Sequence, residues 1–443
     1  MTASTVPQPV TFASSGPLTG RFTVPGDKSI SHRALIFAAL AVGTSHIEGL
    51  LEGEDVLATA AALKAMGAKI MRGDDGKWTV NGVGVGGLMQ PKNAIEMGNS
   101  GTSTRLLMGL IASHDISATF IGDASLTKRP MDRVIDPLSL MGADFTSRGG
   151  CLPLTVRGIY PAIPMEYRLP VASAQVKSAI LLAGLNTPGV TRVIEPVPTR
   201  DHSETMLKGF GADITVELDE DGSRIISLTG EAELKPQNIM VPGDPSSAAF
   251  AVVAALIVPG SDIVIENVGI NPTRAGLFEV LRDMGGDIAY KNKRTVGGEP
   301  VADLHVRHSE LHGVTVSPDI APSMIDEFPI LFVAAALASG TTTTSDLHEL
   351  RVKESDRLSQ MAEGLRSIGV NVSESEDGLI ITGSAGALLN GGGPIETALD
   401  HRIAMSFAVA GLVSQNGVTI DDMSPVATSF PGFQELLHDM AAA

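Results

Sequence analysis

The chain has 443 residues with 48 glycines and 26 prolines, together about 17 % of the sequence, below the roughly 25–30 % typical of low-complexity chains. Hydrophobic residues make up 43 % and charged residues only 19 %, so we expect a globular protein of two or more domains. The net charge of −18 argues against a nucleic-acid or anionic-membrane binder, because either would need a basic face.

The N-terminal segment, 1–20, lacks the basic start and apolar run of a signal peptide. The longest wholly apolar stretch, 248–258, is shorter than the roughly 18 residues of a membrane-spanning helix. The single cysteine, Cys151, excludes an internal disulfide and a multi-cysteine metal site. We therefore expect a soluble cytoplasmic protein.

Six alanine-rich, almost wholly apolar segments recur along the chain, and segments that are apolar on all sides belong in a core. They span 31–42, 102–112, 174–185, 247–258, 324–338 and 402–413. Each leads into a β-like run, at 44–47, 116–121, 190–194, 262–265 and 418–420, with 341–344 a weaker example. The pattern predicts six buried helices, each followed by a strand.

A second series interleaves with the first: a leucine, an apolar residue three positions on and a glycine mark the end of an amphipathic helix. The copies are Leu63/Gly67, Leu138/Gly142, Leu207/Gly211, Leu281/Gly285 and Leu365/Gly369, with a degraded sixth at Leu437/Ala441. Four of them run on into alternating segments typical of strands, such as 68–71 and 212–217. The sequence thus predicts a unit of about 70 residues repeated six times.

One turn motif occurs twice, half a chain apart. Residues 24–29, VPGDKS, are echoed by residues 241–246, VPGDPS, and each copy precedes a predicted buried helix. Either copy alone would be an ordinary Pro-Gly turn. The matched order indicates two domains of three units each, one formed by residues 1–24 with 242–443 and the other by residues 25–241.

Small polar and charged residues gather where the predicted helices begin. Helix N-termini offer unpaired N–H groups and a partial positive charge, which suit phosphate or carboxylate. The buried helices begin with Lys28-Ser29 and Arg33, Asn99 to Thr102, Ser173 to Gln175, Asp244 with Ser246-Ser247, Asp326, and Asp400 to Arg402. Basic residues open four amphipathic helices: Lys128-Arg129, Arg200, Arg274, and Lys353 with Arg357.

Plain capping explains any single serine or aspartate in this set, and a solvated face explains any single lysine or arginine. So many basic residues at equivalent repeat positions of an acidic chain instead favour an anion site that needs no metal.

Several of these segments resemble the EPSP synthase (3-phosphoshikimate 1-carboxyvinyltransferase) family of enolpyruvyl transferases. They are residues 26–33 GDKSISHR, 98–102 GNSGT, 128–131 KRPM, 351–357 RVKESDR and 400–405 DHRIAM. The resemblance covers essentially the whole chain. It implies an α/β fold of two similar domains, each of three βαβαββ repeats around buried helices (an inside-out α/β barrel), with the active site in the interdomain cleft.

The resemblance also implies an activity: transfer of the enolpyruvyl group of phosphoenolpyruvate to the 5-hydroxyl of shikimate 3-phosphate, with release of phosphate. This is a step of chorismate and aromatic amino acid biosynthesis. It implies small-molecule substrates, no cofactor, no metal, no nucleic acid and no membrane, and we expect a monomer. Glyphosate is the expected inhibitor, and Gly101 leaves room for it where a tolerant relative carries Ala.

Site residues follow from the resemblance, position by position. For shikimate 3-phosphate they are Lys28, Ser29, Arg33, Ser173, Ala174, Gln175, Asp326 and Lys353, with Arg200 as a further contact. For phosphoenolpyruvate they are Lys28, Gly101, Arg129, Gln175, Arg357 and Arg402. Asp326 is the expected base for the hydroxyl, with Glu354 and Lys28 as proton donors and acceptors.

Two alternatives remain open at this point. A UDP-N-acetylglucosamine enolpyruvyl transferase would share the fold and the donor, but its usual loop cysteine is missing from residues 122–129. A non-catalytic phosphometabolite-binding protein would need the anion-binding residues but not Asp326 and Glu354 together.

Overall fold

The computed structural model describes residues 9–442, which divide into two compact units. Unit 1 takes the chain up to Pro25, Pro242–Thr295 and the chain from Pro300 on, and unit 2 takes Gly26–Val241 and Val296–Glu299. The sequence placed the crossings after residues 24 and 241, and did not separate 296–299. Those four residues end one strand and begin the next in a long hairpin, and Glu299 lies 2.8 Å from His202 within unit 2.

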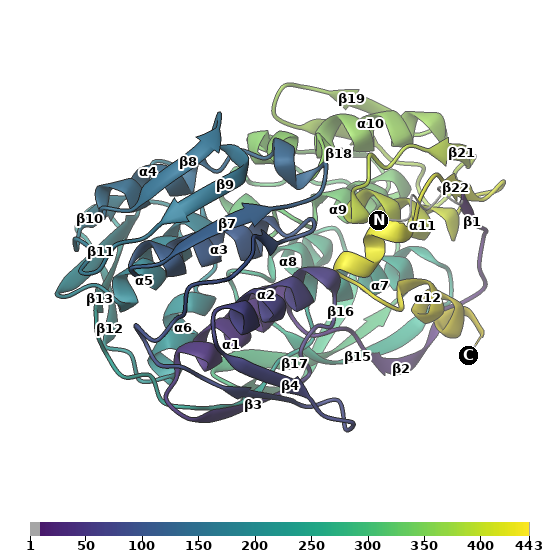
Figure 1. Cartoon of the computed structure of the whole chain (residues 1–443). Coiled ribbons are helices and arrows are strands. Elements are labelled where there is room, and N and C mark those ends of the chain that lie inside the picture. The colour runs from purple at the N-terminus through teal and green to yellow at the C-terminus, as the bar shows by residue number, and fades with distance from the viewer. Residues whose placement is uncertain (1–8, 443) are drawn as a thin grey trace. The chain divides into compact units, whose positions relative to one another are not determined.

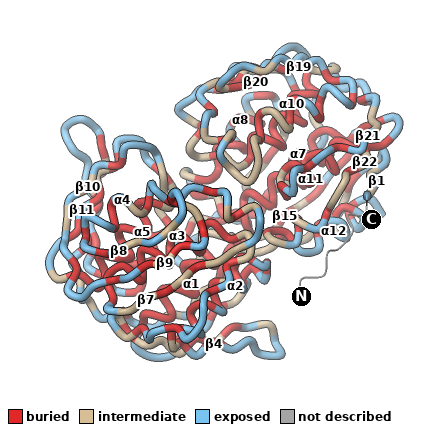
Figure 2. The backbone as a smooth tube through the Cα atoms, turned by 45° about the horizontal axis from the view of Figure 1, so that its top comes forward, coloured by how far each residue is buried: buried red, intermediate tan, exposed pale blue. Residues whose placement is uncertain are grey.

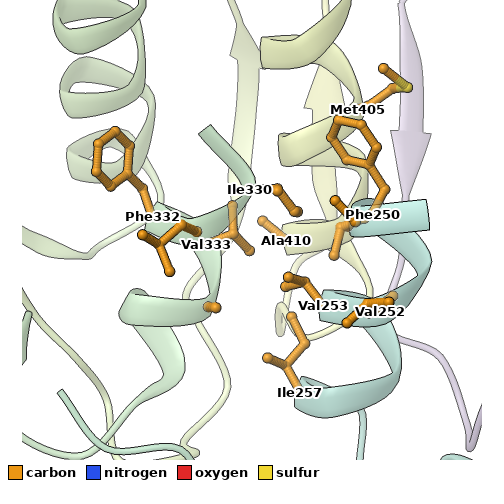
Figure 3. Close-up of a cluster of buried hydrophobic side chains, with 14 of the residues drawn as sticks. Phe250, Val252, Val253, Ile257, Ile330, Phe332, Val333, Met405 and Ala410 are labelled. Carbon is orange, nitrogen blue, oxygen red and sulfur yellow. The ribbon is translucent and has the colours of Figure 1, made fainter. Parts of the chain in front are cut away.

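Each unit is built around three buried helices. Figure 2 colours buried residues red. In unit 2 they are α1 (Lys28–Leu40), α3 (Gly101–Ala112) and α5 (Ala174–Leu185). In unit 1 they are α7 (Pro245–Ile257), α9 (Phe328–Leu337) and α11 (His401–Gly411). All six were predicted. Figure 3 shows how Phe250 and Val253 of α7, Ile330 of α9 and Ala410 of α11 face one another in the core of unit 1.

The start of α9 corrects the prediction, which began this helix at residue 324. Residues 324–327 form turns, and the helix begins at Phe328 with Pro329 in its first turn. Proline favours that position because its missing N–H has no partner there and its φ already suits a helix. Asp326 therefore lies before the helix rather than within it.

The amphipathic helices end where the leucine–glycine pattern predicts. They are α2 (Glu54–Ala65), α4 (Asp132–Leu140), α6 (His202–Gly209), α8 (Gly276–Asp283), α10 (Arg357–Ser367) and α12 (Phe433–Ala442). The glycines after the first five have φ between +88° and +106°, the left-handed conformation of a helix C-cap. Short 3-10 helices η1 (Leu126–Lys128), η2 (Pro318–Ser323), η3 (His348–Val352) and η4 (Ser424–Thr428) join other elements.

Unit 2 contains three four-stranded sheets (Figure 1). The first has the order β14 (Asn238–Met240), β3 (Thr44–Glu48), β5 (Trp78–Asn81), β4 (Lys69–Arg72). The second is β6 (Ile95–Glu96), β7 (Ser117–Ile121), β9 (Cys151–Arg157), β8 (Asp144–Arg148). The third is β10 (Glu166–Arg168), β11 (Val190–Glu195), β13 (Arg224–Thr229), β12 (Ile214–Leu218). In each, the first pair is parallel and the other pairs are antiparallel.

Unit 1 repeats the plan. Its sheets are β2 (Thr19–Thr23), β15 (Asp262–Gly269), β17 (Glu299–Arg307), β16 (Asp287–Val296); β18 (Thr341–Thr343), β20 (Leu379–Thr382), β19 (Asn371–Glu374); and β1 (Val10–Phe12), β22 (Val418–Ile420), β21 (Gly392–Ile395). The repeat is βαβαββ, which confirms the expected fold class. Among the described residues no strand follows α12, and the N-terminal β1 pairs with β22 instead.

The strand that ends each repeat leads the chain across the C-terminal end of a buried helix. The N–H groups of Val83, Ile159 and Glu231 donate to the last carbonyls of α1, α3 and α5 at 2.8, 3.1 and 2.7 Å. The N–H groups of Ser309 and Ser384 do the same for α7 and α9, and that of Ser15 donates to the carbonyl of Leu412, the C-cap residue of α11. These bonds satisfy carbonyl groups that a helix end leaves without partners. No helix among the described residues is long and apolar enough to cross a membrane.

Candidate active site

Lys28 opens α1, and its ammonium group forms an ion pair with the carboxylate of Asp55 in the first turn of α2. Asp27 caps α1, since its side chain accepts a hydrogen bond from the Ile30 N–H at 2.9 Å. The side chains of Asp55 and Lys28 are 8 % and 20 % exposed. A buried carboxylate thus orients the ammonium group. Sequence reasoning missed Asp55, because the contact joins two helices.

A buried imidazole links three helices of unit 2. His32 Nδ1 lies 2.8 Å from Thr59 Oγ1 of α2, which lies 2.6 Å from Ser103 Oγ of α3. Burial, together with the positive charges of Lys28 and Arg33, lowers the pKa of His32 well below its usual value. The ring is therefore neutral at pH 7 and adds no charge beside Lys28.

Arg33 lies inside unit 2, only 4 % exposed. Its Nε donates to Ser203 Oγ at 2.8 Å and its Nη2 to Ser178 Oγ at 2.7 Å. Its Nη1 donates to the carbonyl oxygen of Ser29 at 3.0 Å. The guanidinium group thus ties the first turn of α1, where Ser29 lies, to α5 and α6.

Arg129, directly after η1, reaches the start of α3. Its Nη2 donates to Asn99 Oδ1 and, at 3.2 Å, to Ser125 Oγ. A Cβ atom added to Gly101, the first residue of α3, would lie 3.2 Å from Arg129 Nη1. Gly101 and Arg129 therefore share one surface, on which an added methyl group would require the end of the Arg129 side chain to shift slightly.

Arg105 lies between two of the predicted site residues, Gly101 and Gln175. Its Nη1 donates to Gln175 Oε1 at 2.9 Å and lies 3.1 Å from the place a Cβ on Gly101 would take. Gln175 Nε2 in turn donates to Thr102 Oγ1 at 3.0 Å. Sequence reasoning missed Arg105, although it is the only charged residue of the apolar segment 102–112.

The start of α5 carries Ser173, Ala174 and Gln175. Ser173 caps the helix, since its hydroxyl accepts a hydrogen bond from the Val176 N–H at 3.4 Å. All three are half-buried. Ser173 thus has the local role that capping predicts, in addition to any contact with a ligand.

A buried network of charged side chains surrounds Lys177 and includes Glu195 and Glu204, which lie close in sequence to Arg200. Lys177 of α5 is fully buried, with its Nζ 3.0 Å from Glu195 Oε1 and 2.8 Å from Glu204 Oε1. Glu195 Oε1 also accepts a hydrogen bond from the Thr199 N–H at 3.0 Å. The network therefore fixes the segment directly before Arg200, which is half-buried ahead of α6. The sequence analysis did not identify it.

In unit 1, Arg357 binds three carboxylates at once. Its Nη2 donates to Glu354 Oε2 at 2.6 Å, its Nη1 to Asp326 Oδ1 at 3.3 Å, and its Nε to Asp400 Oδ2 at 2.8 Å. The Arg357 side chain is 1 % exposed. Burial alone would lower its pKa, but Asp400, Glu354 and Asp326 raise that pKa above the usual value. Both carboxylates expected to transfer protons thus share one guanidinium partner.

Lys353 and Arg402 complete this group. Lys353 Nζ lies 3.6 Å from Asp326 Oδ1, and Arg402 Nη1 lies 3.4 Å from Glu327 Oε1. Asp400 caps α11, with its Oδ1 accepting from the Arg402 N–H at 2.9 Å. Three cations therefore face four carboxylates, so this half of the candidate site is not the net basic cluster that an anion site suggests.

Arg274, which the sequence analysis counted among the anion-binding candidates, has a structural position. It is 3 % exposed, and its Nη2 donates to Asp244 Oδ1 at 3.0 Å and to Ser246 Oγ at 2.8 Å. It therefore fixes the start of α7.

The structure thus brings the predicted residues into two groups. One group lies in unit 2 at the starts of α1, α3 and α5, and the other lies in unit 1 around Arg357. A family model described as EPSP synthase (3-phosphoshikimate 1-carboxyvinyltransferase) matches residues 12–437. The chain belongs to this family.

Relatives named 3-phosphoshikimate 1-carboxyvinyltransferase support this membership along the whole chain. The protein of Sphingopyxis alaskensis is 68 % identical over 97 % of each chain. That of Novosphingobium aromaticivorans is also 68 % identical, over 97 % of this chain and 99 % of the relative.

Two solved structures of enolpyruvyl transferases are similar to this chain over nearly its whole length. An EPSP synthase of Acinetobacter baumannii is 48 % identical, with a TM-score of 0.86 over 98 % of each chain. The enolpyruvyl transferase NikO of Streptomyces tendae is 17 % identical and has a TM-score of 0.78 over 98 % of each chain, which shows a shared fold.

Proposed function

We propose that residues of both units act on one pair of substrates in the reaction of the EPSP synthase family. As a member of this family, the chain is a transferase of the shikimate pathway. It moves the enolpyruvyl group of phosphoenolpyruvate to the 5-hydroxyl of shikimate 3-phosphate and releases phosphate. The contacts of Arg357 with Asp326 and Glu354 are the observation that supports the assignment of residues to this reaction.

Unit 2 supplies the helix starts. Shikimate 3-phosphate contacts Lys28, Ser29, Arg33, Ser173, Ala174, Gln175 and Arg200, with Asp326 and Lys353 from unit 1. Phosphoenolpyruvate contacts Lys28, Gly101, Arg129 and Gln175, with Arg357 and Arg402 from unit 1. Arginine suits the carboxylate and phosphate groups of both substrates, because its planar fork donates two parallel hydrogen bonds.

Substrate binding changes the partners of Arg357. An anionic group of phosphoenolpyruvate competes for the guanidinium with Glu354 and Asp326, which are partly exposed. Asp400 keeps its place because it is fully buried. Binding therefore releases Glu354 and Asp326 from Arg357 for proton transfer.

The chemistry proceeds by addition and then elimination. Asp326 takes the 5-hydroxyl proton while the hydroxyl oxygen attacks C2 of phosphoenolpyruvate, and Glu354 and Lys28 supply the proton that adds to C3. In the tetrahedral ketal, the bond between C2 and the phosphate oxygen breaks as a proton leaves C3 to the same pair. The C2–C3 double bond then re-forms. Cationic side chains around the phosphate stabilise its departure.

Phosphate release tests the substrate assignment. Phosphoenolpyruvate is supplied with shikimate 3-phosphate or, separately, with UDP-N-acetylglucosamine, and we expect release only with the former. The variant Asp326→Asn should still bind shikimate 3-phosphate but lose about 10²–10⁴-fold in kcat. The control Asp319→Asn changes an exposed residue of η2 and should keep full activity. If Asp326→Asn instead raises KM at unchanged kcat, Asp326 holds substrate and is not the base.

Three further expectations belong with this function. We propose that the enzyme is cytoplasmic, in keeping with its single cysteine, that it is monomeric, and that glyphosate inhibits it. Light scattering of the full chain tests the monomer, cell fractionation tests the location, and inhibition kinetics against phosphoenolpyruvate test glyphosate.

A further inference from the structure

The tip of the hairpin formed by β16 and β17 lies on α6. The tip consists of residues 296–299, which belong to unit 2 although β16 and β17 are part of a sheet of unit 1. Gly297 and Gly298 have φ of +59° and +87°, as in the tight two-residue turns that join hairpin strands. A Cβ added to Gly298 would lie 3.5 Å from Thr205 Cγ2 of α6, which is ordinary contact. The turn therefore packs on the face of α6 that carries Thr205.

Glu299 follows this turn directly and reaches the same face of α6. Its Oε1 lies 2.8 Å from Nδ1 of His202, which precedes Thr205 by three residues, about one helical turn. The side chains of His202 and Glu299 are 2 % and 4 % exposed. Because a carboxylate only accepts hydrogen bonds, Nδ1 donates to it, and the bond fixes the orientation of both buried side chains. The pair thus holds the start of α6 to the hairpin.

The start of α6 is also held from within unit 2 by the two residues that follow His202. Ser203 Oγ accepts a hydrogen bond from Arg33 Nε of α1 at 2.8 Å. Glu204 Oε1 lies 2.8 Å from the ammonium group of Lys177 of α5. Three consecutive residues of α6 therefore have buried partners in the hairpin, in α1 and in α5.

Arg200 lies between the start of α6 and a second fixed point. That point is Thr199, whose N–H donates to Glu195 Oε1 at 3.0 Å. Thr199 and His202 are both buried, whereas Arg200 is half-buried. Because only two residues separate Thr199 from His202, the place from which the Arg200 side chain extends depends on how these two residues are held.

A ligand contact that is already in place raises affinity, because less free energy is spent on ordering it when the ligand binds. We propose that Glu299 is a positioning residue for shikimate 3-phosphate: through His202 it holds the start of α6 so that Arg200 meets an anionic group of the substrate. Glu299 is 3 % exposed, so it acts through His202 and not on the substrate itself. The assignment rests on the proposed function, in which Arg200 contacts shikimate 3-phosphate.

A double-variant cycle tests the coupling of Glu299 to Arg200. Shikimate 3-phosphate is titrated by calorimetry into the full-length wild type, Glu299→Ala, Arg200→Ala and the double variant. We expect Glu299→Ala to raise the Kd by at least about fivefold, and the double variant to bind within about twofold of Arg200→Ala, because an arginine that is missing cannot be positioned. Losses that multiply would show that the two residues act independently, and they would overturn the proposal, as would an unchanged Kd in Glu299→Ala.

A less disruptive variant repeats the cycle. The shorter side chain of Glu299→Asp withdraws the carboxylate from His202 and leaves a smaller gap than alanine does, so this variant should fold even if Glu299→Ala does not. It should show the same coupling to Arg200→Ala. An affinity of Glu299→Asp equal to that of the wild type would refute positioning through the hydrogen bond to His202.

Steady-state kinetics separate positioning from a loss of folded protein. With saturating phosphoenolpyruvate, Glu299→Ala should raise the KM of shikimate 3-phosphate by at least about fivefold and change kcat by less than about twofold. Glu299→Gln keeps a hydrogen-bond acceptor and should restore that KM to within about twofold of the wild type. A loss of kcat at unchanged KM would show a merely structural role and refute the assignment.

The matched control is a buried carboxylate at the base of the same hairpin. Asp303 of β17 accepts hydrogen bonds from the Asn267 N–H at 3.0 Å and from Asn292 Nδ2 at 2.8 Å, both within unit 1. Asp303→Asn should lower the free energy of unfolding but leave the KM of shikimate 3-phosphate unchanged. An equal rise of KM in Asp303→Asn would show a general effect of the hairpin and contradict a specific role of Glu299.

The wild-type titration distinguishes this assignment from the proposed function. If the wild type does not bind shikimate 3-phosphate, the proposed function is wrong and the assignment of Glu299 is wrong with it. If the wild type binds and Glu299→Ala binds equally tightly, the function stands and only the assignment of Glu299 is wrong.

Discussion

Arg357 and Asp400 form a two-pronged ion pair: Nε donates to Oδ2 at 2.8 Å and Nη2 to Oδ1 at 3.2 Å. Both side chains are essentially inaccessible to solvent. Asp400 also caps α11, so one carboxylate fixes both the central arginine of unit 1 and the helix that begins with His401-Arg402.

Asp400→Asn should therefore destabilise the protein by about 2–4 kcal/mol, because it leaves a buried guanidinium with less negative charge around it. Asparagine can still cap the helix, so the loss reports the ion pair. Urea unfolding of the full chain measures it. The control Asp356→Asn changes the cap of α10, which is partly exposed, and should cost less than about 1 kcal/mol. Equal costs would contradict the central role of the Arg357–Asp400 pair.

The Arg357–Asp400 pair should also make the stability of the protein depend on pH in acid. Burial would raise the pKa of Asp400, but Arg357 holds it below its usual value. A carboxylate with a depressed pKa stabilises the folded state above its unfolded pKa and loses that effect as the pH falls. The difference in unfolding free energy between wild type and Asp400→Asn should thus shrink below about pH 4. Unfolding series from pH 7 to pH 3 check this, and a constant difference would contradict it.

The buried His32 should make the stability of the protein depend on pH in weak acid as well. Its pKa is depressed by burial and by Lys28 and Arg33, so below about pH 6.5 the unfolded chain binds a proton that the folded chain does not. Stability should therefore fall with decreasing pH, and His32→Asn should reduce the slope by up to about 1.4 kcal/mol per pH unit. His438→Asn, at a largely exposed histidine, should leave the slope unchanged. Parallel slopes for all three proteins would refute the neutral state of His32.

Gly230 lies too close to the C-terminal end of α5 for a side chain to fit. A Cβ there would lie 1.9 Å from the carbonyl oxygen of Thr187 and 2.6 Å from that of Gly184. Since backbone atoms cannot step aside cheaply, Gly230→Ala should destabilise unit 2 by about 2–4 kcal/mol. Gly209→Ala, at a helical glycine with nothing within 4 Å, should be neutral or stabilise by up to about 1 kcal/mol. Similar melting temperatures for both variants would contradict this close approach of Gly230 to the end of α5.

Substitution of Gly101 should affect ligand binding and not folding. An added methyl group meets the flexible ends of Arg105 and Arg129 at 3.1 and 3.2 Å, so Gly101→Ala should fold normally. We expect the inhibition constant of glyphosate to rise by at least about tenfold and the KM of phosphoenolpyruvate to rise less, because the inhibitor is the longer molecule. Gly209→Ala again serves as the control. An unchanged inhibition constant in Gly101→Ala would show that the methyl group does not reach the ligand.

Local sequence signals predicted the repeat well. Alanine-rich apolar segments become the buried helices, and the glycines after the leucine pattern adopt the helix C-cap conformation, because both signals act over a few neighbouring residues. The start of α9 was misplaced because Met324 and Ile325 continue the apolar pattern into turns that precede Pro329.

Contacts between helices were not predictable in the same way. The ion pair of Lys28 with Asp55, the network around Lys177, and the bond between Arg105 and Gln175 join residues whose spacing carries no periodic signal. The sequence analysis placed Asp400 at a helix start but not its pairing with Arg357, because that pairing depends on how α10 and α11 pack. Such long-range charge pairs orient the residues that the resemblance could only assign by position.

The pairing of the first strands imposes an order on folding during synthesis. Unit 2 has its last strand, β14, once residue 240 has left the ribosome, apart from the residues 296–299 that join it later. β2 must wait for β15, and β1 must wait for β22, which begins at Val418. The N-terminal strands are thus made first and paired late, so unit 2 should acquire its structure while unit 1 still has unpaired edges, the kind of segment on which misassembly begins.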